Sequence, residues 1–208
     1  MEVVPSFVYL GSTLTRTGDI SLEINRRRGL AAGVMRALRR PLWHHRCISR
    51  RTKLRIYNAV VLSVLLYGAE TWPLSRTLAQ LLQGFDSRAL RTIEGIRWTD
   101  HITNAEIRER TGQLPVLRLL AQRRVRWFGH VLRLPESHPT RRLTDFDPAS
   151  AGWRRPRGAP RTRWVDVLRR DLERVGVRWE EAPALACDRT GWRTVVRRVG
   201  STPSWHEI

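Results

Sequence analysis

The chain has 208 residues, 38 of them basic and 19 acidic, and arginine carries almost all of the net charge of +19 because Lys53 is the single lysine. The two cysteines, Cys47 and Cys187, form no Cys-x-x-Cys pair, which argues against a disulfide framework and a zinc knuckle. The longest apolar run is much shorter than the roughly 20 residues of a membrane span, which argues against a membrane segment. A charge of this size favours a polyanionic partner, since a guanidinium pairs with phosphate through a planar fork, whereas a GC-rich coding sequence would explain only the preference for arginine over lysine.

The first half of the chain predicts a hairpin followed by three helices. Residues 7–14 are β-branched and aromatic with a break at Gly11, which indicates a strand or hairpin within residues 1–18. Residues 21–43 repeat apolar side chains at helical spacing and carry arginines largely on the other side. Residues 49–67 form a second helix, capped by Ser49, and a third ends at Gly95. We therefore expect a compact helical bundle over residues 19–97.

Further helices are expected in the second half. Thr103 and Glu106 have the spacing of a capping box, so a short helix should begin there, and another should cover residues 116–133, all within a segment of residues 98–134. Residues 135–163 are rich in proline, glycine, serine and arginine, which predicts a basic flexible linker. Residues 164–208 predict a small helical segment whose last helix is capped by Asp188. The predicted fold class is mainly α.

Five sequence blocks carry a resemblance to a known family. They are Phe-Val-Tyr-Leu-Gly-Ser at 7–12, Glu-Ile-Asn-Arg-Arg at 23–27, the apolar segment 53–72, Ile-Arg-Trp-Thr-Asp-His at 96–101 and Arg-Trp-Phe-Gly-His-Val at 126–131. In this order they resemble the end of the palm, the thumb and the post-thumb region of the endonuclease–reverse transcriptases of non-LTR (LINE-type) retrotransposons. The resemblance covers residues 7–196. It implies that residues 19–97 are a thumb-like bundle.

The resemblance implies a part of the enzyme that performs no chemistry. The parent family is an RNA-directed DNA polymerase whose Tyr/Phe-Ala-Asp-Asp carboxylates hold two divalent metal ions, and we expect that motif to lie upstream of Phe7. The endonuclease domain has no counterpart either. We therefore expect no catalytic residue, no metal ligand and no cofactor in this chain, and a divalent metal only in the missing palm domain. His44, His45 and Cys47 lack a fourth ligand for zinc, and Asp100 with His101 lacks a nucleophile.

A thumb is expected to hold an RNA/DNA hybrid or a duplex by its backbone, which requires cations on one face. The alternative is a solvated basic face without a ligand. The candidate contacts on the bundle are Arg26, Arg36, Arg39, Arg40, Arg50, Arg51, Lys53 and Arg55, and those on the later helix are Arg118 and Arg126.

The segment 154–163 has five arginines and no acid, and its prolines favour an extended backbone. A phosphate-tracking strip, a nuclear localisation signal and a solvated linker all remain open. The candidate contacts are Arg154, Arg155, Arg157, Arg161 and Arg163. Trp153 and Trp164, on either side of the segment, are candidates for base stacking, whereas core packing is expected for Trp72, Trp98 and Trp127.

Arg27 falls on the apolar side of the first predicted helix and so needs a partner. Glu70 is the expected one, in a structural ion pair, and the alternative is an arginine that reaches into the nucleic-acid groove.

Three functions remain open for the whole chain. The first is a non-catalytic, nucleic-acid-binding fragment of a retrotransposon reverse transcriptase. The second is a host-retained DNA- or RNA-binding or interaction protein, and the third is a decayed reading frame without function or partner. The N-terminus shows neither a secretory signal nor an organelle address, so we expect a nuclear or cytoplasmic protein that is neither secreted nor bound to a membrane.

Overall fold

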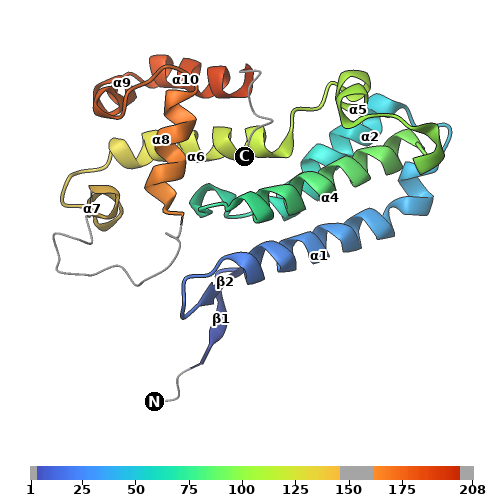
Figure 1. The fold of residues 1–208 in the computed structure, drawn as a ribbon, viewed down its shortest axis with the longest axis horizontal. Helices are drawn as coiled ribbons and strands as arrows, with labels where there is room; N and C mark the ends of the chain where they lie inside the picture. Colours follow the sequence, from blue (N-terminus) through green and yellow to red (C-terminus); the bar gives the residue numbers. More distant parts are fainter. Residues whose placement is uncertain (1–3, 146–161, 202–208) are drawn as a thin grey trace. The chain divides into compact units, whose positions relative to one another are not determined.

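A computed structural model describes residues 4–145 and 162–201, and these residues are mainly helical, as predicted (Figure 1). The chain divides into two compact units, with the division between Leu117 and Arg118. Among the residues described, no helix is long and apolar enough to cross a membrane.

The first unit begins with the predicted hairpin. Strand β1 (Ser6–Tyr9) pairs antiparallel with β2 (Ser12–Thr15), and Phe7 lies opposite Leu14. The two turn residues both have positive φ, 46° at Leu10 and 79° at Gly11. A two-residue turn of this kind matches the twist of the strands, and glycine adopts it without steric cost. The hairpin is therefore held in register by its turn.

The first helix ends where proline interrupts its hydrogen bonds. Helix α1 (Ser21–Ala37) is followed by a π-helical turn, η1 (Arg39–Trp43), which contains Pro41. Proline has no N–H to continue an α-helix, and the Trp43 N–H instead donates to the Leu38 carbonyl at 3.0 Å. Trp43 is then buried, with its indole N–H on the Met35 carbonyl at 2.9 Å.

The predicted second helix is present, but it widens in the middle. It consists of α2 (Arg50–Ile56), a π-helical turn η2 (Tyr57–Val61) and α3 (Leu62–Leu65), with Ser49 accepting from the Thr52 N–H at its start. The Ser63 hydroxyl donates to the carbonyls of Ala59 and Val60, and such bonding competes with the helix for its own acceptors. Gly68, at φ 68°, ends the helix before the short η3 (Ala69–Thr71).

Helix α4 (Arg76–Glu94) is the third helix of the bundle, and it ends at Gly95 as predicted, while the Ser75 side chain caps its start. It packs on α1, α2 and α5 (Asn104–Thr111), the last of which follows a single turn, η4 (Trp98–Asp100). The capping box is confirmed, since Thr103 and Glu106 bond each other's backbone N–H groups at 2.8 and 3.2 Å. Among the tryptophans expected in the core, Trp72 is buried.

The expectation that Trp98 and Trp127 are core residues is wrong. Trp98 is 83% exposed, because it lies on the isolated turn η4, and Trp127 is 36% exposed on a helix of the second unit.

Asp86 connects three segments of the first unit from a buried position on α4. It accepts a hydrogen bond from the Tyr57 hydroxyl at 2.6 Å through one oxygen and a bond from Arg108 of α5 through the other. Burial and the neighbouring Asp86 carboxylate raise the pKa of Tyr57 above its ordinary value, so this phenol stays protonated and donates. The bundle is thus joined by a polar contact that is shielded from water.

The second unit consists of α6 (Val116–Leu132) from Arg118 onward, α7 (Pro139–Asp145), α8 (Trp164–Glu173), η5 (Trp179–Glu181), α9 (Ala182–Cys187) and α10 (Arg189–Ser201). Helix α7 corrects the prediction of a structureless linker at residues 139–145, and residues 146–161 of that linker lie outside the described residues. Asp188 caps α10 as predicted, by accepting from the N–H groups of Thr190 and Gly191.

The core of the second unit forms around Phe128 of α6. The Phe128 ring stacks on Trp179 with centroids 5.0 Å apart, and the rings of Trp164 and Trp192 lie at 6.2 Å. An ion pair is buried beside this cluster, where Arg124 contacts Asp171 of α8 at 2.5 Å. Helices α6 and α8 are therefore joined by both apolar and ionic contacts.

Gly129 allows α10 to approach α6 closely. A Cβ atom added at Gly129 would lie 2.0 Å from the indole nitrogen of Trp192, which donates to the Val125 carbonyl at 3.1 Å. At the other end of α10, Gly200 lies against the flexible Gln122 side chain, and a Cβ there would lie 2.1 Å from its amide nitrogen, so the glutamine would have to move. Gly129 belongs to the Arg-Trp-Phe-Gly-His-Val block, and its contact with Trp192 explains why that block has a glycine at this position.

We expect Gly129→Ala to destabilise the chain by at least about 2 kcal/mol, because Trp192 must move and lose its hydrogen bond. Gly33→Ala is the matched control, since a Cβ there meets nothing within 4 Å on helix α1. This control should stabilise by about 0.5–1 kcal/mol. Thermal unfolding followed by near-UV circular dichroism measures both, and equal melting temperatures for the two variants would contradict the packing argument.

We expect Tyr57→Phe to cost about 2 kcal/mol of unfolding free energy, because it leaves a buried oxygen of Asp86 without its donor. Tyr67→Phe serves as the control. The Tyr67 hydroxyl also makes one hydrogen bond, 2.9 Å from the Leu10 carbonyl, but at an exposed position, so its loss should cost less than about 0.5 kcal/mol. Denaturant unfolding of both variants measures the difference, and the prediction fails if the two costs are equal.

Candidate nucleic-acid interface

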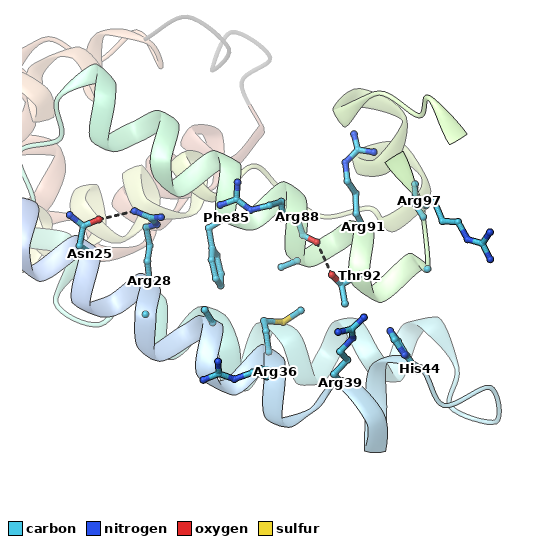
Figure 2. Close-up of a pocket in the computed structure, with 16 residues that line it drawn as sticks. Asn25, Arg28, Arg36, Arg39, His44, Phe85, Arg88, Arg91, Thr92 and Arg97 are labelled. Carbon is cyan, nitrogen blue, oxygen red and sulfur yellow. Dashed lines mark hydrogen bonds between the residues drawn. The ribbon is translucent and has the colours of Figure 1, made fainter. Parts of the chain in front are cut away.

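A cleft of about 1010 Å³ opens between α1 and α4 in the first unit (Figure 2). Its walls carry seven basic side chains and no aspartate or glutamate. We call it the α1/α4 cleft. The basic residues that line it are Arg28, Arg36, Arg39, His44, Arg88, Arg91 and Arg97.

The helical repeat explains why the cations gather there. On α1, residues 28, 32 and 36 lie on one side of the helix, and Arg39 of η1 continues that side; on α4, residues 85, 88 and 92 share one side. The same sides carry small or apolar residues, Gly29 and Ala32 on α1 and Phe85 and Ala89 on α4. Small side chains leave the space between the helices open. Figure 2 shows Phe85 projecting from α4 into this space, opposite the arginines of α1.

Several of these guanidinium groups are available to a ligand. Within the residues described, the side chains of Arg36, Arg39, Arg88 and Arg97 form no ion pair and no hydrogen bond. Arg28 donates to Asn25 at 2.7 Å, but its Nε atom is buried without a partner. A buried donor of this kind costs free energy until an acceptor reaches it.

The guanidinium of Arg91, which also lines the cleft, is fixed in position by hydrogen bonds to the protein. It donates to the Ile102 carbonyl at 2.7 Å and to the Asn104 side chain at 3.2 Å. These bonds join α4 to the segment before α5 and fix the position of one positive charge. The other guanidinium groups remain exposed or partly exposed around it.

The α1/α4 cleft can bind an extended anion. Arginines that face one another without acids repel, and a phosphate chain between them removes this repulsion while accepting bidentate hydrogen bonds. The apolar residues between the cations exclude water from part of the wall, which strengthens the electrostatic attraction. A phosphodiester backbone has the required charge and length.

Two of the predicted contacts, Arg36 and Arg39, lie in the cleft. Arg40, Arg51 and Arg55 are exposed outside it. Arg50 pairs with Glu94 at 3.1 Å and Lys53 donates to the Trp43 carbonyl at 2.7 Å, so both also hold parts of the fold together.

Arg26 and Arg27 bind the hairpin turn. Both donate to the Gly11 carbonyl, and Arg27 also contacts Glu23 at 2.6 Å and lies 4.3 Å over the Tyr67 ring. The expected partner Glu70 is therefore wrong, because Glu23, one helical turn before Arg27, provides the carboxylate instead. Burial opposes ionisation of Glu23, but the hydrogen bonds from Arg27 and Thr13 outweigh it and lower the pKa of this carboxyl. Arg27 is a structural residue.

The remaining candidates belong to the second unit or lie outside the described residues. Arg118 donates to the Gly200 carbonyl at 3.1 Å, and Arg163 pairs with Asp166 at 3.2 Å. Arg126 lies in a second cleft, between α6 and α10. Trp164 is partly buried against Phe128. Trp153, Arg154, Arg155, Arg157 and Arg161 lie outside the described residues.

Several lining residues were not predicted from the sequence. Arg28 was placed only on the solvated side of the first helix, and Arg88, Arg91 and Arg97 were not singled out. The available signal was the helical spacing of Arg88 and Arg91 beside the apolar stripe of the third helix. Within the described ranges, no three histidine, cysteine, aspartate or glutamate side chains gather where they could hold a metal ion.

Comparison with known proteins gives one distant similarity. The chain is 24% identical, over 208 aligned residues, to an uncharacterized transposon-derived protein of Caenorhabditis elegans, and the alignment covers 95% of this chain and 72% of the nematode protein. No family model and no solved structure matches. The similarity extends through both compact units.

Proposed function

We propose that this chain is a non-catalytic, nucleic-acid-binding segment of transposon origin, derived from the thumb and post-thumb region of a non-LTR retrotransposon reverse transcriptase. Its α1/α4 cleft holds the sugar–phosphate backbone of a hybrid or duplex. The observation that carries the proposal is the acid-free lining of six arginines and one histidine. The similarity to a transposon-derived protein supports the origin.

Binding in the cleft would be independent of base sequence. Guanidinium groups on two helix walls contact phosphate oxygens, and phosphate contacts position a nucleic acid without reading it. One strand's backbone enters the cleft while the bases remain outside. A thumb requires this mode of binding, because the polymerase must move along any template.

We further propose that the chain performs no nucleotide addition by itself, because that reaction needs carboxylates that hold two metal ions. A primed RNA template, labelled nucleotides and Mg²⁺ test this directly with the purified chain. Primer extension that depends on the metal and persists after repeated purification would contradict the proposal. The expected result is no extension above a no-protein control.

The central test is the salt dependence of binding to duplex DNA and to an RNA/DNA hybrid. With about six phosphates contacted, the logarithm of the affinity should fall with the logarithm of salt concentration at a slope near −5 on duplex DNA. The double variant Arg36→Ala with Arg39→Ala should bind more weakly, with a slope that is shallower by about one for each phosphate that is no longer bound. Fluorescence anisotropy of a labelled duplex measures both quantities.

Arg76→Ala with Arg110→Ala is the matched control for this experiment. Both arginines are exposed on the same unit, away from the cleft, and their removal changes the net charge equally. The control should retain the wild-type slope. Equal losses in the two double variants would mean that net charge, and not the cleft, determines binding, and an affinity that does not change with salt would favour a chain without a nucleic-acid partner.

A further inference from the structure

A second basic cleft, of about 780 Å³, lies between α6 and α10 within the second unit. We call it the α6/α10 cleft. Like the first cleft it has no acidic side chain in its lining, but it shares no residue with it. The basic residues that line it are Arg126, His130, Arg133, Arg189, Arg193 and Arg197.

The cations form one stripe on each wall. Arg189, Arg193 and Arg197 recur every fourth residue along α10, so they share one side of that helix over about 12 Å. On α6, Arg126 and His130 have the same spacing. Like charges at this spacing destabilise an isolated helix, so an arrangement of this kind favours a bound anion.

The protein leaves most of these cations unpaired. Within the described part of the chain, the side chains of Arg126, Arg189, Arg193 and Arg197 make no ion pair and no hydrogen bond. Arg133 is anchored by a bond to the Ala186 carbonyl at 2.9 Å. The nearest acid in the sequence, Asp188, is occupied as the cap of α10. The α6/α10 cleft therefore holds its positive charge without internal compensation.

An aromatic pair adjoins the cation stripe on α6. The rings of Trp127 and His130 lie 5.2 Å apart at 36°, His130 lines the cleft, and both side chains are exposed. Exposed aromatic rings beside a basic groove provide surfaces on which unpaired bases stack. A duplex cannot offer its bases in this way, since they are stacked inside it.

We propose that the α6/α10 cleft is a binding site for single-stranded nucleic acid, separate from the α1/α4 cleft. Phosphates of one strand lie between the arginines of α10 and those of α6, and a base stacks on Trp127 and His130. A stripe of about 12 Å spans a few phosphates of one strand, which fits a cleft of this volume. The inference does not depend on the proposed function, because all of its residues belong to the second unit.

The test uses the full chain carrying Arg36→Ala and Arg39→Ala, so that binding in the α1/α4 cleft is already weakened. Arg193→Ala with Arg197→Ala is added to it, and a labelled oligothymidylate or oligouridylate of about ten nucleotides is titrated by fluorescence anisotropy. We expect the affinity for both single strands to fall about ten-fold at physiological salt, with a slope shallower by about 0.7 for each phosphate that is no longer bound. The affinity for duplex DNA should change less than two-fold, which corresponds to a change in binding free energy of about 0.4 kcal/mol or less.

Arg142→Ala with Arg170→Ala is the matched control, since both arginines are exposed on the second unit outside the cleft. It should bind single strands as the parent does. Equal binding by the α10 variant and this control would overturn the inference, as would an equal loss on duplex and single strand. Displacement of the oligonucleotide by polyglutamate at equal charge concentration would also overturn it, by identifying an acidic peptide as the ligand. Trp127→Ala and His130→Ala should each reduce the single-strand affinity, whereas an unchanged affinity in both variants would reject the stacking contact.

Discussion

The structure depends on carboxylates that are buried against arginine. Asp86 accepts a hydrogen bond from Tyr57 and pairs with Arg108, Glu23 pairs with Arg27, and Asp171 pairs with Arg124. Each carboxylate joins segments that are distant in sequence or fixes the start of a helix. Removing one partner of such a pair leaves an unpaired charge away from water, which is far more costly than losing a surface ion pair. These contacts hold each unit together from within.

The same contacts determine the charge of the surface. The chain has half as many acids as bases, and several of its acids are buried or occupied as caps, as Glu106 and Asp188 are. Among the described residues, only a few exposed arginines, such as Arg50, Arg163 and Arg178, are seen in an ion pair. Neither cleft has an aspartate or glutamate in its lining, and several acids that could have compensated its charge are buried or cap helices. The arrangement that stabilises the fold also prepares it for an anionic partner.

Local signals in the sequence predicted the elements well. Ser49, Thr103, Asp188, Gly68 and Gly95 mark helix ends through hydrogen bonds or backbone conformations that involve only neighbouring residues. Arg27 was correctly predicted to need a partner, since its burial follows from helical spacing. Its partner was missed, because the choice between Glu23 and Glu70 depends on the hairpin turn that also binds the guanidinium.

The clefts could not be predicted from the sequence, because each requires two helices to face each other. Helical spacing showed that Arg36 and Arg39 share a side of the first predicted helix, but it carried no information that the side of α4 with Arg88 lies opposite. On α10, three arginines that recur every fourth residue look the same in the sequence whether the stripe faces solvent or another basic helix. What distinguishes the two cases is close approach, and in the second unit Gly129 allows that approach, because a Cβ there would lie 2.0 Å from the Trp192 indole. Gly129 thus lets the basic stripes of α6 and α10 reach the same opening, so a substitution that separates these helices should weaken single-strand binding without removing any charge.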